Sequence, residues 1–190
     1  MEAEYLNGRT TSTSTSAYVR NTDANSAVQG VSNNSYLEVT NATGTAEVTF
    51  EIPQILAGEY DVYVDFVPPV IDGVALAEEK TRLEFRLVYP RADKNGTANI
   101  SRDDDDDPDL IIGGDSVGDN KVKTLKVWEA LELPAANYYD GMWFMDEDNS
   151  TDDVKVRTTF RIRTNVKAPE VNVKYRRRFR VDRIRFVPVP

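Results

Sequence analysis

The chain has 190 residues, a formal net charge of −9, and neither cysteine nor histidine. A chain of this length fits one domain that buries roughly 70% of its unfolded surface, and the negative charge argues against general nucleic-acid binding, which needs clustered Lys and Arg. The composition excludes disulfides, Cys/His zinc sites, thiol nucleophiles and a histidine general base.

Membrane and export signals are not visible in the sequence. No apolar run reaches the roughly 20 residues that a transmembrane helix needs. Met1 is followed by charged residues instead of a signal-peptide core. We therefore expect any export signal to lie outside this sequence and no direct membrane insertion of this segment.

The first half of the chain predicts a polar connection followed by strands. Residues 9–35 are rich in Ser, Thr and Asn, which predicts a long connection with one short strand around Ala17–Arg20. Further on, apolar and polar residues alternate, as in strands with one buried face. The predicted strands are Tyr36–Thr40, then Val48, Phe50 and Ile52, then Tyr60, Val62, Val64 and Phe66, then Leu83, Phe85, Leu87 and Tyr89. Between the last two, Val74–Lys80 predicts a short helical turn.

The second half adds three strands and one irregularity. They are Leu125–Leu133, the run Val154, Val156, Thr158, Phe160 and Ile162, and Arg178–Val187. In the last strand the alternation slips by one residue at Asp182–Arg183, which predicts a β-bulge, since a shifted strand would turn its apolar side chains to water. Many strands without βαβ alternation predict an all-β, antiparallel β-sandwich with long polar loops. We predict one domain over 1–190, with an irregular acidic insertion around 92–123.

Carboxylates gather in two loops, Asp103–Asp109 and the segment MDEDNSTDD around Asp146–Asp153. Such loops suit calcium, which takes six to eight oxygen ligands, although neither has EF-hand spacing. A block of like charges equally fits a solvated loop. Paired carboxylates also serve glycosidases, but nothing singles out a pair with separated pKa values. We therefore predict a non-catalytic protein, with a glycoside hydrolase as the second alternative.

Aromatic and basic clusters supply the other candidates. The segment NYYDGMWF contains Tyr138, Tyr139, Trp143 and Phe144, which either stack on a sugar or a partner protein or cap the core. Trp128 is out of phase with its strand and is either exposed or directed to the opposite sheet face. The last strand is basic, with Lys174, Arg176, Arg177, Arg178, Arg180, Arg183 and Arg185. These arginines either pair with carboxylates across strands or bind a phosphate or acidic glycan.

Three stretches carry a family resemblance: the opening EAE (Glu2 to Glu4), the segment SYLEVTNATGTAEVTFEIPQILAGEYDVYVDF (Ser35 to Phe66), and the closing FRVDRIRF. Together they resemble the galactose-binding-like jelly-roll domains, especially family 6 and family 35 carbohydrate-binding modules. The matching features are an early acidic strand, an aromatic residue that opens a strand, a Gly-Tyr turn, and a final Asp before an Ile-x-Phe ending. The resemblance covers roughly the first third and the last tenth of the chain.

The resemblance implies a structural calcium that pins the two terminal strands. Its candidate ligands are Glu2, Glu4 and Asp182. The alternative is a terminal strand edge whose acidic residues face Arg183 or Arg185. The candidate ligand-binding residues are Tyr36 and Trp143, which best match the aromatic pair of such modules, Tyr138 and Tyr139 from the aromatic segment, and Arg180, at a position where family 6 modules commonly carry a sugar-contacting Asn.

By this resemblance we predict a non-catalytic, cell-surface carbohydrate-binding-like module, within a larger glycan-handling or adhesion protein such as a bacterial surface lipoprotein with fasciclin-like domains. We expect an extracellular or periplasmic location and, as partner, a glycan or a cell-surface protein. Glycan binding predicts at least two of the aromatic candidates exposed around one concavity. The alternative, a structural or adhesion module without sugar binding, predicts a pocketless face or an exposed strand edge.

Overall fold

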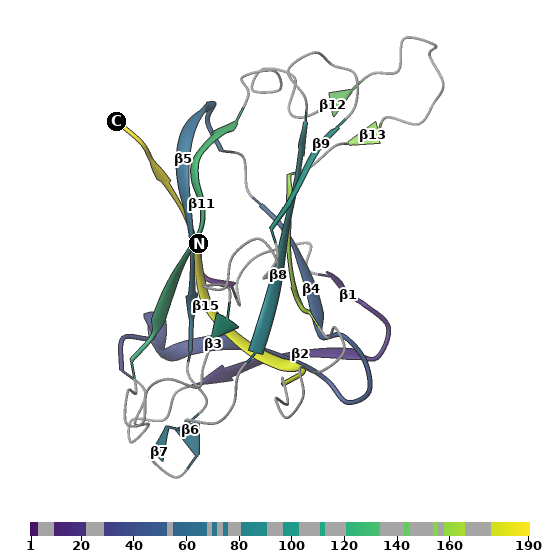
Figure 1. Cartoon of the computed structure of the whole chain (residues 1–190), viewed down its shortest axis with the longest axis vertical. Coiled ribbons are helices and arrows are strands. Elements are labelled where there is room, and N and C mark those ends of the chain that lie inside the picture. The colour runs from purple at the N-terminus through teal and green to yellow at the C-terminus, as the bar shows by residue number, and fades with distance from the viewer. Residues whose placement is uncertain are drawn as a thin grey trace.

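Two antiparallel sheets make up most of the computed structural model, and they pack against each other as a sandwich (Figure 1). The structure describes residues 1–3, 10–21, 29–52, 55–67, 70–71, 74–75, 81–90, 97–102, 111–112, 121–133, 143–144, 154–155, 158–165 and 176–190. In this part of the chain, no helix has the length and apolar character needed to cross a membrane. The predicted all-β antiparallel sandwich is confirmed.

The five-stranded sheet has the strand order β11-β5-β15-β3-β2. Its members are β2 (Thr15–Asn21), β3 (Ser35–Asn41), β5 (Gly58–Phe66), β11 (Lys123–Leu133) and β15 (Arg178–Pro188). All of these strands pair antiparallel. The strands predicted at both ends of the chain therefore lie in one sheet.

The six-stranded sheet has the order β1-β4-β14-β8-β10, with β9 also paired to β8. Its members are β1 (Thr10–Thr11), β4 (Glu47–Glu51), β8 (Thr81–Pro90), β9 (Thr97–Arg102), β10 (Ile111–Ile112) and β14 (Thr159–Thr164). Two short ribbons, β6 (Val70–Ile71) with β7 (Val74–Ala75) and β12 (Trp143–Phe144) with β13 (Val154–Lys155), and the 3₁₀ turn η2 (Ser32–Asn34) complete the described elements.

From β3 to β15, the chain passes back and forth between the two sheets. Strands β3, β5, β11 and β15 belong to the five-stranded sheet, and β4, β8 and β14, which alternate with them along the chain, belong to the six-stranded sheet. This back-and-forth winding is that of a double-sheet jelly roll. It places strands that are distant in sequence side by side, so β15 lies between β3 and β5.

The core lies between the sheets and uses the alternating apolar positions. The predicted positions Val48, Phe50, Val62, Val64, Phe66, Leu83, Phe85, Leu87, Phe160 and Ile162 are all buried. Aromatic rings bridge the sheets, with Phe66 of β5 6.3 Å from Phe85 of β8 and Trp128 of β11 5.7 Å from Phe160 of β14. Register shifts on both sides of Trp128 accompany its turn toward the core. Trp128 is therefore not exposed, and its side chain packs against Phe160 of the six-stranded sheet on the core side.

The predicted bulge in the last strand is confirmed. Val181 lies opposite Phe66, while Arg183, two residues later, lies opposite the adjacent Asp65. Asp182 is the extra residue, and both Val181 and Ile184 are fully buried. The bulge thus keeps the apolar side chains on the core side across the slip in the sequence pattern.

Two predicted elements differ from the structure. The run from Val154 to Ile162 does not form one strand, because Val154–Lys155 pairs with Trp143–Phe144 while Thr159–Thr164 joins the six-stranded sheet. The short helical turn predicted at Val74–Lys80 is wrong at its start, where Val74 and Ala75 pair with β6. In both cases a short pairing partner decides the backbone conformation, and such a partner leaves little trace in apolar periodicity.

Candidate functional site

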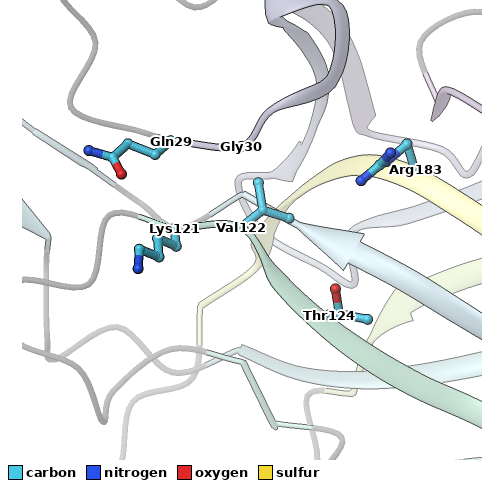
Figure 2. A pocket seen from close by; sticks show the side chains of 6 residues that line it. All are labelled: Gln29, Gly30, Lys121, Val122, Thr124 and Arg183. Atoms are coloured by element: carbon cyan, nitrogen blue, oxygen red, sulfur yellow. The ribbon is translucent and has the colours of Figure 1, made fainter.

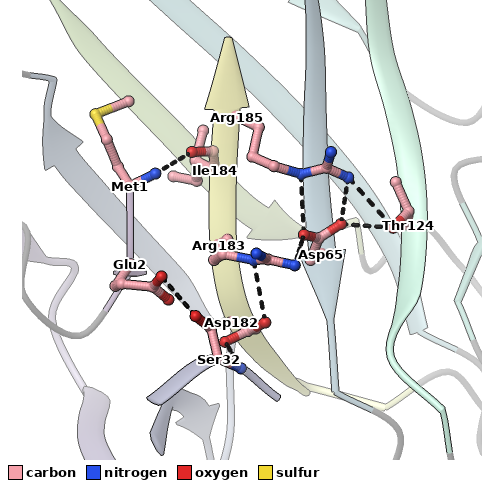
Figure 3. A network of polar contacts seen from close by, with 9 residues as sticks. All are labelled: Met1, Glu2, Ser32, Asp65, Thr124, Asp182, Arg183, Ile184 and Arg185. Atoms are coloured by element: carbon pink, nitrogen blue, oxygen red, sulfur yellow. Dashed lines mark hydrogen bonds and ion pairs between the residues drawn. The ribbon is translucent and has the colours of Figure 1, made fainter. Parts of the chain in front are cut away.

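The N-terminal residues lie along the last strand, close to its bulge. The Met1 amino group donates a hydrogen bond to the Ile184 carbonyl at 2.9 Å, and the Ile184 N–H donates to the Met1 carbonyl at 2.9 Å. Glu2 forms an antiparallel bridge with Arg183. The two ends of the chain are therefore neighbours in the fold, and Figure 3 shows the side chains that meet there.

We call the cluster of Glu2, Ser32 and Asp182 the terminal corner. The Ser32 backbone N–H donates to Asp182 Oδ1 at 3.0 Å, and the Ser32 hydroxyl donates to Glu2 Oε1 at 2.7 Å (Figure 3). Asp182 is completely buried. Glu2 Oε2 is also buried, and among the described residues it has no hydrogen-bond partner. One serine thus links the two carboxylates that were predicted to converge.

Asp65 of β5 organises the charges beside the terminal corner. Its buried carboxylate accepts two hydrogen bonds from the Arg185 guanidinium, at 2.9 and 3.0 Å, and one from the Thr124 hydroxyl at 2.5 Å. Arg183 lies 3.1 Å from Asp65 Oδ2 and 3.4 Å from Asp182 Oδ2, so it bridges the two aspartates (Figure 3). Charge-assisted, bidentate bonds of this kind fix side chains strongly.

A shallow hollow of about 420 Å³ lies next to this network. Its described lining consists of Gln29, Gly30, Lys121, Val122, Thr124 and Arg183 (Figure 2). The Val122 N–H donates to the Gln29 carbonyl at 3.2 Å, which ties the loop before β3 to the start of β11. Gly30 has a φ of 86°, and a side chain there would meet open space. The wall therefore combines an amide, a hydroxyl, two cations and one aliphatic side chain.

Arg180, a predicted ligand-binding residue, is paired within the outer face of the five-stranded sheet. Its Nε donates to Glu38 Oε2 at 2.9 Å, and Arg20 donates to Glu38 Oε1 at 3.2 Å. Burial raises the pKa of Glu38, but the charge of Arg180 and the bond from Arg20 outweigh it, and the pKa lies below the ordinary value of 4.5. Tyr36 lies opposite Arg20 in the same sheet and is half-buried.

Tyr63 occupies the outer face between β15 and β11. The Arg185 guanidinium lies 5.2 Å and the Lys126 ammonium 5.7 Å from its ring centroid. The hydrogen bond from Lys126 lowers the pKa of Asp61 and raises the pKa of Lys126. Because two cations already contact this ring, Tyr63 packs against neighbouring side chains on the outer face of the sheet.

The structure brings some of the predicted site residues together. Glu2 and Asp182 meet in the terminal corner, whereas Tyr36 and Arg180 lie on the outer face of β3 and β15. Trp143 belongs to β12, where it lies opposite Lys155. Glu4, Tyr138 and Tyr139 lie outside the described residues, as do the acidic segments at 103–109 and 146–153. The aromatic concavity predicted for glycan binding therefore stays a prediction.

The cross-strand pairing predicted for the C-terminal arginines is found for three of them. Arg180 pairs with Glu38, and both Arg183 and Arg185 pair with Asp65.

Three residues of this network, Ser32, Asp65 and Thr124, were not predicted from the sequence. The sequence does mark Asp65, because it is an acidic residue at an outward position near the end of an alternating strand. Ser32 is not marked, because it lies in a segment full of similar polar residues.

Within the described ranges, no three His, Cys, Asp or Glu side chains gather into a group that could hold a metal ion. The terminal corner contributes two carboxylates, and the third predicted ligand, Glu4, is outside these ranges. The orphaned oxygen of Glu2 fits a cation there, while Arg183 already supplies positive charge next to Asp182.

The fold and the terminal corner define a jelly-roll β-sandwich with a polar hollow at one end. No protein-family model and no curated protein matches the chain. Solved structures that it matches include a Paenibacillus xanthan lyase, at 15% identity and a TM-score of 0.48, over 99% of this chain and 13% of that chain. Another is the Podospora anserina GH26-CBM35 β-(1,4)-mannanase, at 15% identity and a TM-score of 0.40, over 96% of this chain and 28% of that chain.

The matched structures also include a CBM35 from Paenibacillus barcinonensis, at 11% identity and a TM-score of 0.36, over 95% of this chain and 98% of that chain. The solved structures thus include carbohydrate-binding modules, the class that the sequence resembles. With every one of these TM-scores below 0.5, the fold assignment rests on the strand order of the chain itself.

Proposed function

We propose that this chain is a non-catalytic glycan-binding module and that the hollow beside the terminal corner receives the sugar. The observation that carries the proposal is the hollow itself, with hydrogen-bonding groups from Gln29, Lys121, Thr124 and Arg183 around the aliphatic Val122. Hydroxyl groups of a sugar match such donors and acceptors, and its C–H face matches a small apolar contact. An open, polar hollow suits a ligand rich in hydroxyl groups better than an apolar one.

The composition of the hollow supports binding without hydrolysis. Most glycosidases place two carboxyl groups on either side of the scissile bond. The described lining carries two cations, Lys121 and Arg183, and the carboxylate of Asp65, which contacts the lining residues Arg183 and Thr124, is buried under hydrogen bonds from Arg185 and Thr124. A carboxylate held in this way is poorly placed to protonate or attack a sugar.

A glycan array followed by calorimetry with the best ligand tests this function. We expect Lys121→Ala combined with Gln29→Ala to weaken binding at least about tenfold, which corresponds to 1.4 kcal/mol. Lys123→Ala is the matched control, because Lys123 is an exposed lysine two residues away that is not among the lining residues. Its affinity should stay within about twofold of the wild type. Equal losses in both variants, or no bound glycan, would contradict the proposal.

Calcium at the terminal corner is the second part of the proposal. The buried, unpartnered Glu2 Oε2 supports it, because a carboxylate oxygen buried away from water and donors is costly unless a cation approaches. Glu2 and Asp182 would hold the ion, and Glu4 would complete the carboxylate set by the sequence resemblance. Since Glu2 and Asp182 belong to opposite ends of the chain, the ion would fasten those ends to each other.

The cellular location of the parent protein and a second candidate function, adhesion, are also proposals. By the sequence resemblance, the parent protein is exported to the cell surface, the periplasm or the medium, which cell fractionation of the full-length protein tests. An adhesion or architectural module is the second candidate function. Tyr18 and Val19 on the edge strand β2 favour it, because both are about half exposed.

A further inference from the structure

The strand β2 forms one edge of the five-stranded sheet and is unusually exposed at its second half. All seven of its residues, Thr15–Asn21, pair with β3 in continuous register. The last four are exposed, including Tyr18 at 47% and Val19 at 50%. A long, regular edge strand presents unpaired backbone groups and invites another strand.

Three of the other edge strands, β11, β1 and β10, are protected in ways that β2 is not. At the opposite edge of the same sheet, β11 has two register shifts and carries the charged residues Lys123, Lys126, Glu129 and Glu132. In the six-stranded sheet, the end strands β1 and β10 have two residues each, whereas β9, which pairs with β8 alone among the described strands, is a second regular edge of six residues. Bulges, charges and short length are the usual defences against edge pairing. The sequence TSAYVRN of β2 has one charge, no proline and no bulge.

The apolar side chains of β2 reach both faces of the sheet. Val19 lies opposite Leu37, whose side chain is completely buried, yet Val19 itself is half exposed. The core face of the sheet therefore extends beyond the cover of the second sheet at this edge. On the outer face, Tyr18 lies under the Arg20 guanidinium at 5.1 Å. An added strand would cover both side chains.

We propose that β2 is a self-association surface, and that it pairs antiparallel with β2 of a second copy around a twofold axis at Tyr18. This register overlaps the whole strand, with Thr15 opposite Asn21 and Ala17 opposite Val19. It also places Arg20 opposite Ser16, so the one charge of the strand does not meet its own copy. Such an isologous contact closes after two copies and joins the two five-stranded sheets into one. The inference stands independently of glycan binding.

The oligomeric state provides the first test. Light scattering after size exclusion should show the apparent mass rising from 21.4 kDa toward twice that value as the protein concentration increases. Val19→Lys should hold the mass at one chain. The matched control is Val187→Lys, at another exposed valine of the same sheet, 40% exposed and on β15; this variant should associate like the wild type. A wild-type chain that stays monomeric up to about 1 mM overturns the proposal, since even weak complexes populate there.

Engineered cysteines test the register, because the chain has no cysteine of its own. In the proposed pairing, Tyr18→Cys faces its copy at roughly 4.5–5.5 Å between Cα atoms, within the range of a disulfide. Asn21→Cys is the control, since it lies roughly 20 Å along the strand from its copy. We expect rapid interchain disulfide formation for the first variant alone. Equal cross-linking of both variants, or of neither, overturns the register.

Discussion

Single carboxylates organise this molecule at the residue scale. Asp65 takes hydrogen bonds from Arg185 and Thr124 and an ion pair from Arg183, so one buried acid fixes side chains from β15 and β11. Glu38 does the same between Arg20 and Arg180. Because both acids lie on the outer face, the sandwich has charge pairing across its strands as well as an apolar core.

Glu38→Gln should destabilise the protein more at neutral pH than at acid pH. The folded-state pKa of Glu38 is lowered below 4.5, so its contribution is fully present above the unfolded pKa and disappears as the pH falls through the folded one. At pH 7 we expect a loss of about 1–3 kcal/mol, because Arg180 and Arg20 lose a charged acceptor. Urea unfolding at pH 7 and pH 3 measures the difference.

The control for this variant is Glu132→Gln, at an exposed position of β11. Its effect should stay within about 0.5 kcal/mol at both pH values. If Glu38→Gln cost as much at pH 3 as at pH 7, the loss would come from packing instead of charge.

The sequence predicts buried residues far better than polar partners. Apolar alternation identifies Phe50, Phe85 and Phe160 because each strand carries its own period. The contact between Ser32 and Asp182 spans 150 positions in sequence, and no local pattern encodes it. Glu2 and Asp182 were predicted together through family resemblance, whereas the hollow formed by Gln29 and Lys121 depends on two loops whose meeting only the fold determines.

At the element scale, the bulge at Asp182 is the feature that sets the register of the last strand. Deleting Asp182 would leave Arg183 opposite Asp65 and Ile184 opposite Val64, as in the present pairing. We therefore expect the deletion variant to fold, with a loss of about 1–3 kcal/mol because the Ser32 N–H loses its acceptor. Denaturant titration followed by circular dichroism measures this loss.

Adding a residue should have the opposite outcome. An alanine inserted between Asp182 and Arg183 would turn Ile184 to water and the neighbouring arginines toward the core. We expect little or no folded protein, while an alanine inserted between Val189 and Pro190, beyond the strand, should be tolerated. A well-folded variant with the first insertion would show that the bulge absorbs extra residues and does not set the register.

Strand prediction succeeds where a strand has one buried face and fails where pairing is short. The long strands β4, β5, β8 and β15 follow the alternation closely. The run from Val154 to Ile162 alternates just as well, yet it is divided between two sheets. Apolar periodicity indicates which face of a strand is apolar. The strand with which it pairs depends on the tertiary structure, which a local sequence pattern does not encode.

At the scale of the whole molecule, the fold places the first residues of the chain beside its last strand, β15. Met1 pairs with Ile184 through two backbone hydrogen bonds, and the side chain of Glu2 reaches Ser32, whose backbone in turn holds Asp182. The contact between Met1 and Ile184 joins residues 183 positions apart. Closing so long a loop costs chain entropy on folding, so a ligand that fastens the two ends would stabilise the entire domain.

Calcium should therefore raise the melting temperature of the whole domain if it binds at the terminal corner. A ligand that binds only the folded state at 100 times its Kd adds about 2.7 kcal/mol, which corresponds to roughly 5–10 °C for a domain of this size. We expect this shift in a thermal melt with calcium and its loss with EDTA. Glu2→Gln should abolish the shift, whereas Glu132→Gln, the same chemical change at an exposed position of β11, should keep it. A shift that persists in Glu2→Gln would assign the calcium elsewhere, and no shift in the wild type would leave the termini held by Met1, Ser32 and Arg183 alone.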